Sequence, residues 1–93
     1  MKNQTYRMTM LFDFYGEVLT PRQKEFFDLY YNQDYSLTEI AELSGISRQG
    51  VHDAIARAER QLREFEEKTG AVARARQVDH AVAVIRAEAE RLP

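Results

Sequence analysis

The sequence predicts an all-α protein with a helix-turn-helix core, a long recognition helix and a C-terminal helix. Glycine and proline are scarce, at four and two residues among 93, which suits long helices better than a sandwich or barrel. Apolar residues recur at three- and four-residue steps through most of the chain, the period of an amphipathic helix. The length fits a single domain, residues 1–93.

The first predicted helix runs from Thr5 to Leu19 and carries one apolar stripe. The stripe consists of Met8, Leu11, Phe12, Tyr15, Val18 and Leu19. Thr20 and Pro21 then predict a second helix, because threonine caps a helix N-terminus and proline fits the first helical position. This helix ends at residues 32–34, and its aromatic residues are expected in the core rather than as a base-stacking platform. They are Phe26, Phe27, Tyr30 and Tyr31.

Residues 36–57 have the layout of a helix-turn-helix. Ser36 and Glu39 form a capping box that begins a short helix. Its expected buried stripe is Leu37, Ile40, Ala41 and Leu43. Gly45 then allows the left-handed conformation of a tight turn, and Ser47 caps the next helix. Ile46 and Val51 are expected to fill the angle between the two helices, so the first turns of the second helix project outward.

Two heptad-spaced stripes follow in the predicted C-terminal helical and dimerisation segment, residues 58–93. The helix from Arg48 to Lys68 has apolar residues at Val51, Ile55, Ala58, Leu62 and Phe65. Gly70 ends it, and a last helix from Ala71 to Arg91 carries Ala75, Val78, Val82, Ile85, Ala89 and Leu92. Leu62 and Phe65 extend beyond the helix-turn-helix core and need cover. The last stripe predicts a homodimer, and an intrachain hairpin with a frayed C-terminus is the alternative.

The candidate nucleic-acid-binding residues are those that project from the start of the second helix of the motif. They are Ser47, Arg48, Gln49, His52, Asp53 and Arg57. Arginine and glutamine can contact base edges, serine and arginine can contact phosphate, and a helix N-terminus favours an anion. Asp53 opposes phosphate but could accept a hydrogen bond from a cytosine amino group. A solvated helix face is the alternative interpretation of these side chains.

Composition and charge exclude several other classes. The chain has no cysteine, so it has no disulfide framework, thiolate nucleophile or zinc-thiolate site. His52 and His80 have no nearby acidic pair at ligand spacing, so neither a metal nor a cofactor is expected. No enzyme motif, signal peptide or membrane span is evident, which favours a cytoplasmic, non-enzymatic protein. Glu64, Glu66 and Glu67 are expected to form a solvated face.

Two blocks resemble the YlxM family of bacterial helix-turn-helix proteins, residues 11–15 (LFDFY) and residues 47–53 (SRQGVHD). Residues 19–23, 37–41 and 46–51 are similar to the promoter-reading C-terminal domain of housekeeping sigma factors. The resemblance implies a DNA- or RNA-binding regulator associated with the signal recognition particle pathway.

Three functional hypotheses follow. The first is a non-enzymatic nucleic-acid-binding regulator whose contact surface lies in residues 47–57. The second is a protein-docking adaptor of the signal recognition particle GTPase that makes no direct nucleic-acid contact. The third is a structural dimer module. The net charge of −2 lacks the basic excess typical of nucleic-acid binders, so contact with phosphate would require local clustering of basic residues.

Overall fold

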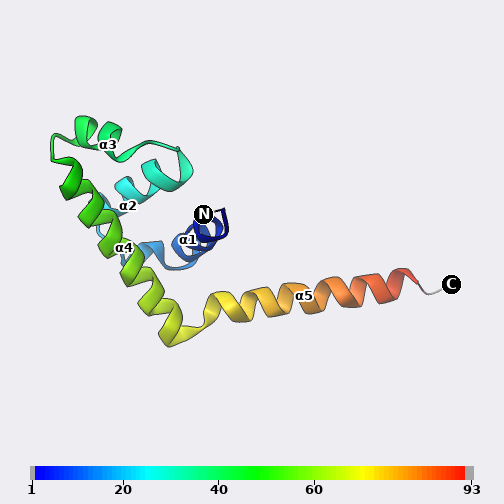
Figure 1. Cartoon of the computed structure of the whole chain (residues 1–93). Coiled ribbons are helices and arrows are strands. Elements are labelled where there is room, and N and C mark those ends of the chain that lie inside the picture. The colour runs from blue at the N-terminus through cyan, green and yellow to red at the C-terminus, as the bar shows by residue number, and fades with distance from the viewer. Residues whose placement is uncertain (1, 92–93) are drawn as a thin grey trace.

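A computed structural model describes residues 2–91, which are helical almost throughout. The elements in chain order are α1 (Lys2–Tyr15), the 3-10 turn η1 (Gly16–Val18), α2 (Pro21–Phe27), the π-helical turn η2 (Asp28–Asn32), α3 (Leu37–Ser44), α4 (Arg48–Thr69) and α5 (Ala71–Glu90). Helices α1 to α4 form one body, and α5 projects from it (Figure 1), so the molecule measures 63 × 26 × 21 Å. The predicted all-α fold, with its long recognition helix and C-terminal helix, is confirmed.

Helix α4 supplies one continuous buried stripe to both parts of the core. Val51 and Ile55, near its start, are 0% and 3% exposed. They pack with Phe26, Ile40 and partly buried neighbours that include Leu37, Ala41 and Ile46. Ala58 and Leu62, one and two turns further on, are both 0% exposed. They pack with Met8, Leu11, Tyr15, Leu19, Phe27 and Val72.

Helix α1 therefore covers the part of α4 that extends beyond the helix-turn-helix. Leu62 is fully buried beneath it. Phe65 lies at the edge of the same cluster, with its ring centroid 6.0 Å from that of Tyr15. The cover that these two residues need comes from within the chain, fully for Leu62 and in part for Phe65.

Helix α1 ends earlier than predicted. The helix stops at Tyr15, and the chain tightens into η1 before Leu19 takes an extended conformation. The prediction that Val18 lies on the buried stripe is wrong, because the 3-10 turn rotates its side chain outward and leaves it 38% exposed. Gly16 is buried, and a Cβ there would lie 3.2 Å from the ring of Phe12, so a larger residue would require that ring to shift by a few tenths of an ångström.

The aromatic residues of the second helix are only partly core. Phe26 and Phe27 are 2% and 0% exposed, as expected. The helix then widens into η2, which turns Tyr30 to the surface at 37% exposure and leaves Tyr31 half-buried. The prediction that Leu43 is buried is also wrong. It is 66% exposed, because α3 is only eight residues long and the core meets it along the side that carries Ile40 and Ala41.

One carboxylate fixes the joint between α4 and α5. Gly70 adopts φ +62°, which ends α4 and lets α5 start at once. Glu66 accepts hydrogen bonds from the Tyr15 hydroxyl at 2.7 Å and from the backbone N–H groups of Val72 and Ala73 at 3.1 Å each. Partial desolvation raises the pKa of Glu66, but these hydrogen bonds outweigh it and hold the pKa below 4.5. Glu66 is therefore a capping group of α5, and the prediction that it is solvated is wrong.

The body covers only the first turns of α5. Val72 is 6% exposed, whereas Val78, Val82 and Ile85 are 60%, 41% and 66% exposed. The chain does not fold back along α4 (Figure 1), so the alternative of an intrachain hairpin is wrong. Leu92, the last residue of the predicted stripe, lies outside the described residues.

The turn between α3 and α4 leads to a first prediction. Gly45 has φ +74°, and a Cβ there would meet nothing within 4 Å, so replacing it costs backbone strain without a steric clash. We expect Gly45→Val to lower the free energy of unfolding by more than about 1 kcal/mol in urea denaturation. Gly45→Asn is the control and should cost clearly less, because asparagine tolerates the left-handed region. Equal losses would contradict strain as the cause.

The joint leads to a second prediction, on pH. The pKa of Glu66 is lowered in the folded chain, so the stability from its ionised form is present above pH 4.5 and is lost as the pH falls through the folded pKa. We expect Glu66→Gln to be less stable at neutral pH and to lose less stability than the wild type between about pH 5 and pH 3. Urea denaturation across this range measures both. Glu67→Gln, at an exposed neighbour, should keep the wild-type slope, and a wild-type slope in Glu66→Gln would refute this role.

Candidate nucleic-acid interface

Local hydrogen bonds set the angle between α3 and α4. The Ser36 hydroxyl accepts from the backbone N–H of Glu39, and the Glu39 carboxylate accepts from the N–H of Ser36, both at 3.1 Å. At the other end, the N–H of Gly45 donates to the carbonyl of Ala41 at 2.9 Å. The predicted capping box and left-handed glycine are thereby confirmed, and they fix where α4 begins.

Ser47 caps α4, and Gly50 gives that cap room. The Ser47 hydroxyl accepts from the backbone N–H of Gly50 at 3.0 Å. A Cβ on Gly50 would stand 3.2 Å from that hydroxyl oxygen and 3.4 Å from Cδ1 of Ile46. Because Ser47 supports the helix start, its replacement would disturb folding as well as any contact with a ligand.

All six predicted site residues lie on one exposed surface, which we name the outward face of α4. It comprises Ser47, Arg48, Gln49, His52, Asp53 and Arg57. They stand away from the buried stripe and follow the first three turns of a 22-residue helix. The side chains are therefore accessible to a large, flat or grooved partner.

Asp53 organises the polar groups of this face. The Gln49 side-chain amide donates to the Asp53 carboxylate at 2.9 Å, and Nδ1 of His52 lies 3.4 Å from the same oxygen. The hydrogen bond from Gln49, followed by that from His52, lowers the pKa of Asp53. A base contact by Gln49 would have to replace this exposed hydrogen bond, which is weak in water.

The same surface extends beyond the predicted residues. Arg60 is exposed one turn after Ala56 and Arg57. Arg63 follows, with its side chain 46% exposed and its guanidinium 3.6 Å from the Glu59 carboxylate. The motif predicted from the sequence ends at residue 57 and includes neither arginine. The signal was present, because Gln49, Ala56, Arg60 and Arg63 fall on one side of a helix at three-, four- and seven-residue steps.

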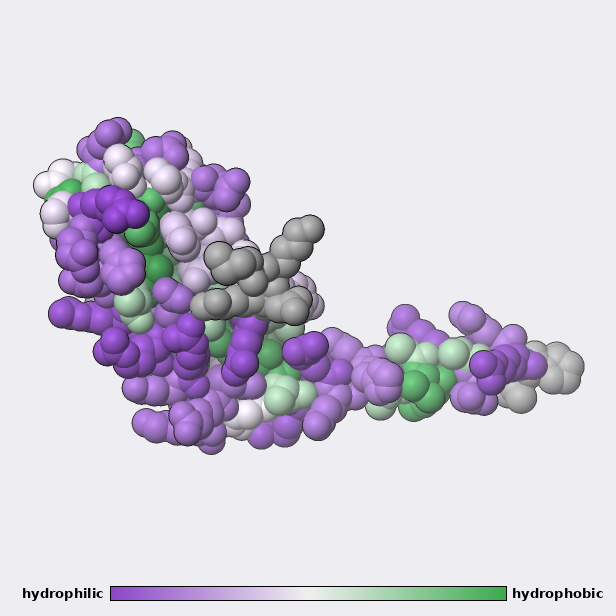
Figure 2. All heavy atoms as spheres, in the orientation of Figure 1, coloured by the Kyte–Doolittle hydropathy of each residue, from purple (hydrophilic) through white to green (hydrophobic). Residues whose placement is uncertain are grey.

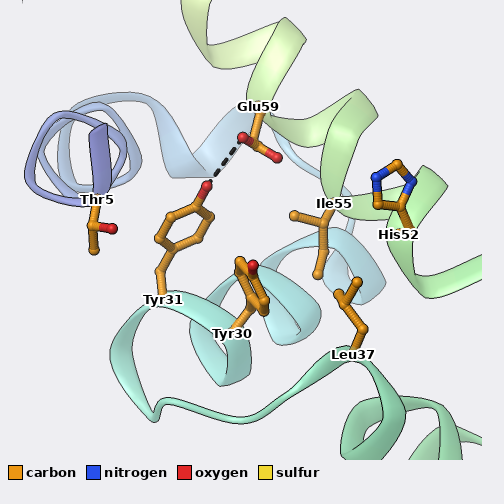
Figure 3. A pocket seen from close by; sticks show the side chains of 7 residues that line it. All are labelled: Thr5, Tyr30, Tyr31, Leu37, His52, Ile55 and Glu59. Atoms are coloured by element: carbon orange, nitrogen blue, oxygen red, sulfur yellow. Dashed lines mark hydrogen bonds between the residues drawn. The ribbon is translucent and has the colours of Figure 1, made fainter. Parts of the chain in front are cut away.

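A groove opens beside the outward face, between η2, α3 and α4 (Figure 3). Its cavity of about 240 Å³ is lined by Thr5, Tyr30, Tyr31, Leu37, His52, Ile55 and Glu59. The Tyr31 hydroxyl donates to Glu59 at 3.0 Å, and burial together with that carboxylate raises the Tyr31 pKa. A second hollow of about 500 Å³ shares Tyr30, Tyr31 and Leu37 and reaches Arg48. Sequence periodicity did not predict the groove, because η2 interrupts the α-helical period.

These features define the class of the protein as a helix-turn-helix protein with an extended second helix. None of the helices among residues 2–91 combines the length and hydropathy needed to cross a bilayer.

Comparisons with known proteins agree with that class. Residues 2–91 match the UPF0122 family, described as "Putative helix-turn-helix protein, YlxM / p13 like", and the chain belongs to this family. A UPF0122 protein of Thermoanaerobacter sp. (strain X514) is 56% identical over 71 residues, which are 76% of this chain and 61% of the relative. One from Oceanobacillus iheyensis is 52% identical over 68 residues, 73% of this chain and 65% of the relative. The chain thus spans less than two thirds of the length of these relatives.

Proposed function

We propose that the chain is a cytoplasmic, non-enzymatic regulator that binds DNA or RNA through the outward face of α4. The observation that carries this proposal is the exposure of all six predicted residues along the first three turns of α4, beginning at its capped N-terminus. The backbone N–H groups of a helix N-terminus favour a phosphate, and arginine and glutamine side chains can reach base edges. Membership of a family described by its helix-turn-helix supports the same function.

Local charge supports it further. The chain carries a net charge of −2, but residues 48–63 contain four arginines against two carboxylates, those of Asp53 and Glu59. Glu59 is engaged by the Tyr31 hydroxyl and lies beside Arg63. Basic side chains therefore outnumber acidic ones over the first sixteen residues of α4, where phosphate contact is proposed, whereas the whole helix carries five of each.

The alternative function is a protein-docking adaptor of the signal recognition particle GTPase. The groove favours it, since Leu37 and Ile55 offer apolar contacts beside the polar groups of Glu59, a combination that suits a protein side chain. The association with the signal recognition particle comes from the family resemblance alone. Salt separates the two functions, because phosphate contacts lose affinity steeply with salt whereas an apolar interface does not.

We further propose that the chain is a homodimer through α5. The stripe of that helix stays exposed beyond its first turns, and contiguous exposed apolar surface is typical of an interface. Two copies would also present two outward faces, and linked binding would compensate for the modest charge of one.

Substitutions on the outward face test the first proposal. We expect Arg48→Ala and Gln49→Ala each to weaken binding to DNA or RNA roughly tenfold, since each removes a direct contact, and to leave the melting temperature unchanged. Arg76→Ala on α5 is the matched control for Arg48→Ala, because it removes the same charge from another exposed position. Gel retardation at low salt measures binding. A wild-type protein that retards neither DNA nor RNA would refute the function and leave the fold untouched.

Sedimentation equilibrium at micromolar concentration tests the dimer. We expect a species of twice the 10.9 kDa chain mass. Val82→Asp places a charge on the stripe and should shift the protein to the monomer without unfolding the body, which Val82 does not contact. A wild-type protein found only at the monomer mass would rule the dimer out.

A further inference from the structure

We infer that the helix occupying the exposed stripe of α5 is α5 of a second copy, running antiparallel to the first. This inference rests on the dimer proposed above and adds the relative direction of its two α5 helices. It does not depend on nucleic-acid binding, so the two can fail separately.

No part of the described chain packs against the apolar stripe of α5 beyond its first turns. Figure 2 shows hydrophobic surface on the projecting α5, away from the body. The contributors on the stripe are Val78, Val82 and Ile85, between 41% and 66% exposed. Val84 is also exposed, but it lies on the opposite side of the helix. Most helix stability in proteins comes from packing of an apolar face, and beyond its first turns the stripe of α5 has no such packing within the chain.

The order of residues along the stripe is symmetric about Val82. Ala75 and Ala89 lie seven residues before and after Val82. Val78 lies four residues before Val82, and Ile85 lies three residues after it. A two-fold axis near Val82 sets the small Ala75 opposite the partner's Ala89. It also sets the larger Val78 opposite the partner's Ile85. Side-chain size therefore allows an antiparallel pair as well as an in-register parallel pair, and the flanking charges distinguish the two.

The charged residues that flank the stripe favour the antiparallel pair over the parallel one. Arg74 and Glu88 lie on one edge, and Asp79 and Arg86 lie on the other. In an antiparallel pair, Arg74 approaches the partner's Glu88 and Asp79 approaches the partner's Arg86, and each contact occurs twice. In a parallel pair, the heptad geometry brings only Arg74 and the partner's Asp79 together. Arg74 also donates to the Thr69 carbonyl at 2.6 Å, and its guanidinium has further donors to share.

The antiparallel arrangement also keeps the two bodies apart. Residues 1–70 contain nine basic and twelve acidic side chains, so each body is negatively charged. A parallel pair would place both bodies at one end. With the axis near Val82, the two Gly70 residues lie about 36 Å apart along the pair. The two outward faces then sit at opposite ends of the dimer, which suits a nucleic acid bound at two separated stretches.

Single cysteines test the direction, because the chain has none of its own. We expect Val82→Cys to form a covalent dimer with itself on oxidation. Ala75→Cys and Ala89→Cys should each remain uncoupled alone and should form a covalent heterodimer when mixed. This second pair keeps Val82 in place, so it still reports if Val82→Cys disturbs packing. Val84→Cys, exposed but off the stripe, is the control and should stay uncoupled.

A charge exchange gives an independent measurement. Asp79→Arg should weaken the dimer several-fold in sedimentation equilibrium. Asp79→Arg together with Arg86→Asp should restore it, because residues 79 and 86 of the two copies then again carry opposite charges.

The outcomes are distinct. Self-coupling of both Ala75→Cys and Ala89→Cys would overturn the antiparallel arrangement while leaving the dimer. Failure of Val82→Cys and of the mixed pair to couple would overturn the α5 interface altogether. Loss of nucleic-acid binding with normal coupling would refute only the function proposed for α4.

Discussion

The position of every other element depends on the buried side of α4. Its residues Val51, Ile55, Ala58 and Leu62 are at most 3% exposed, and they contact α1, α2 and α3 in turn. Because one side of this helix is fully used by the core, the other side is left to solvent along its length. The same constraint that builds the body therefore determines which residues form the outward face. A change on the buried side would shift that face, whereas a change at an exposed side chain with no capping role leaves the body intact.

The sequence predicted the features that depend on neighbouring residues. The cap at Thr20, the capping box at Ser36, the left-handed Gly45 and the cap at Ser47 each require only a few residues in the right order, and all are present. It failed where the environment comes from a distant part of the chain. Glu66 follows the pattern of a solvated helix end, yet Tyr15, 51 positions away, donates a hydrogen bond to it. No local pattern carries that information.

The candidate site could be predicted in part, because its residues are those that the buried positions of α4 leave exposed. Once the apolar positions of α4 are known, the helical period places Arg48, Gln49 and Asp53 outside. The hydrogen bond between Gln49 and Asp53 was not predicted, although their spacing of four residues allows it. The groove could not be predicted, because it requires the widened turn η2 to bring Tyr30 next to α4. The shape of the groove therefore depends on the backbone geometry of η2, which residue types alone do not specify.

The joint at Glu66 makes the direction of α5 sensitive to small changes at its base. Tyr15 of α1, the carboxylate of α4 and the first N–H groups of α5 meet at this one point. Helix α5 has 20 residues and extends about 30 Å from it, so a rotation of 10° at the joint would displace the far end by roughly 5 Å. The length of α5 therefore magnifies at its tip any change of angle at Glu66, so the hydrogen bonds at the base set where the tip lies.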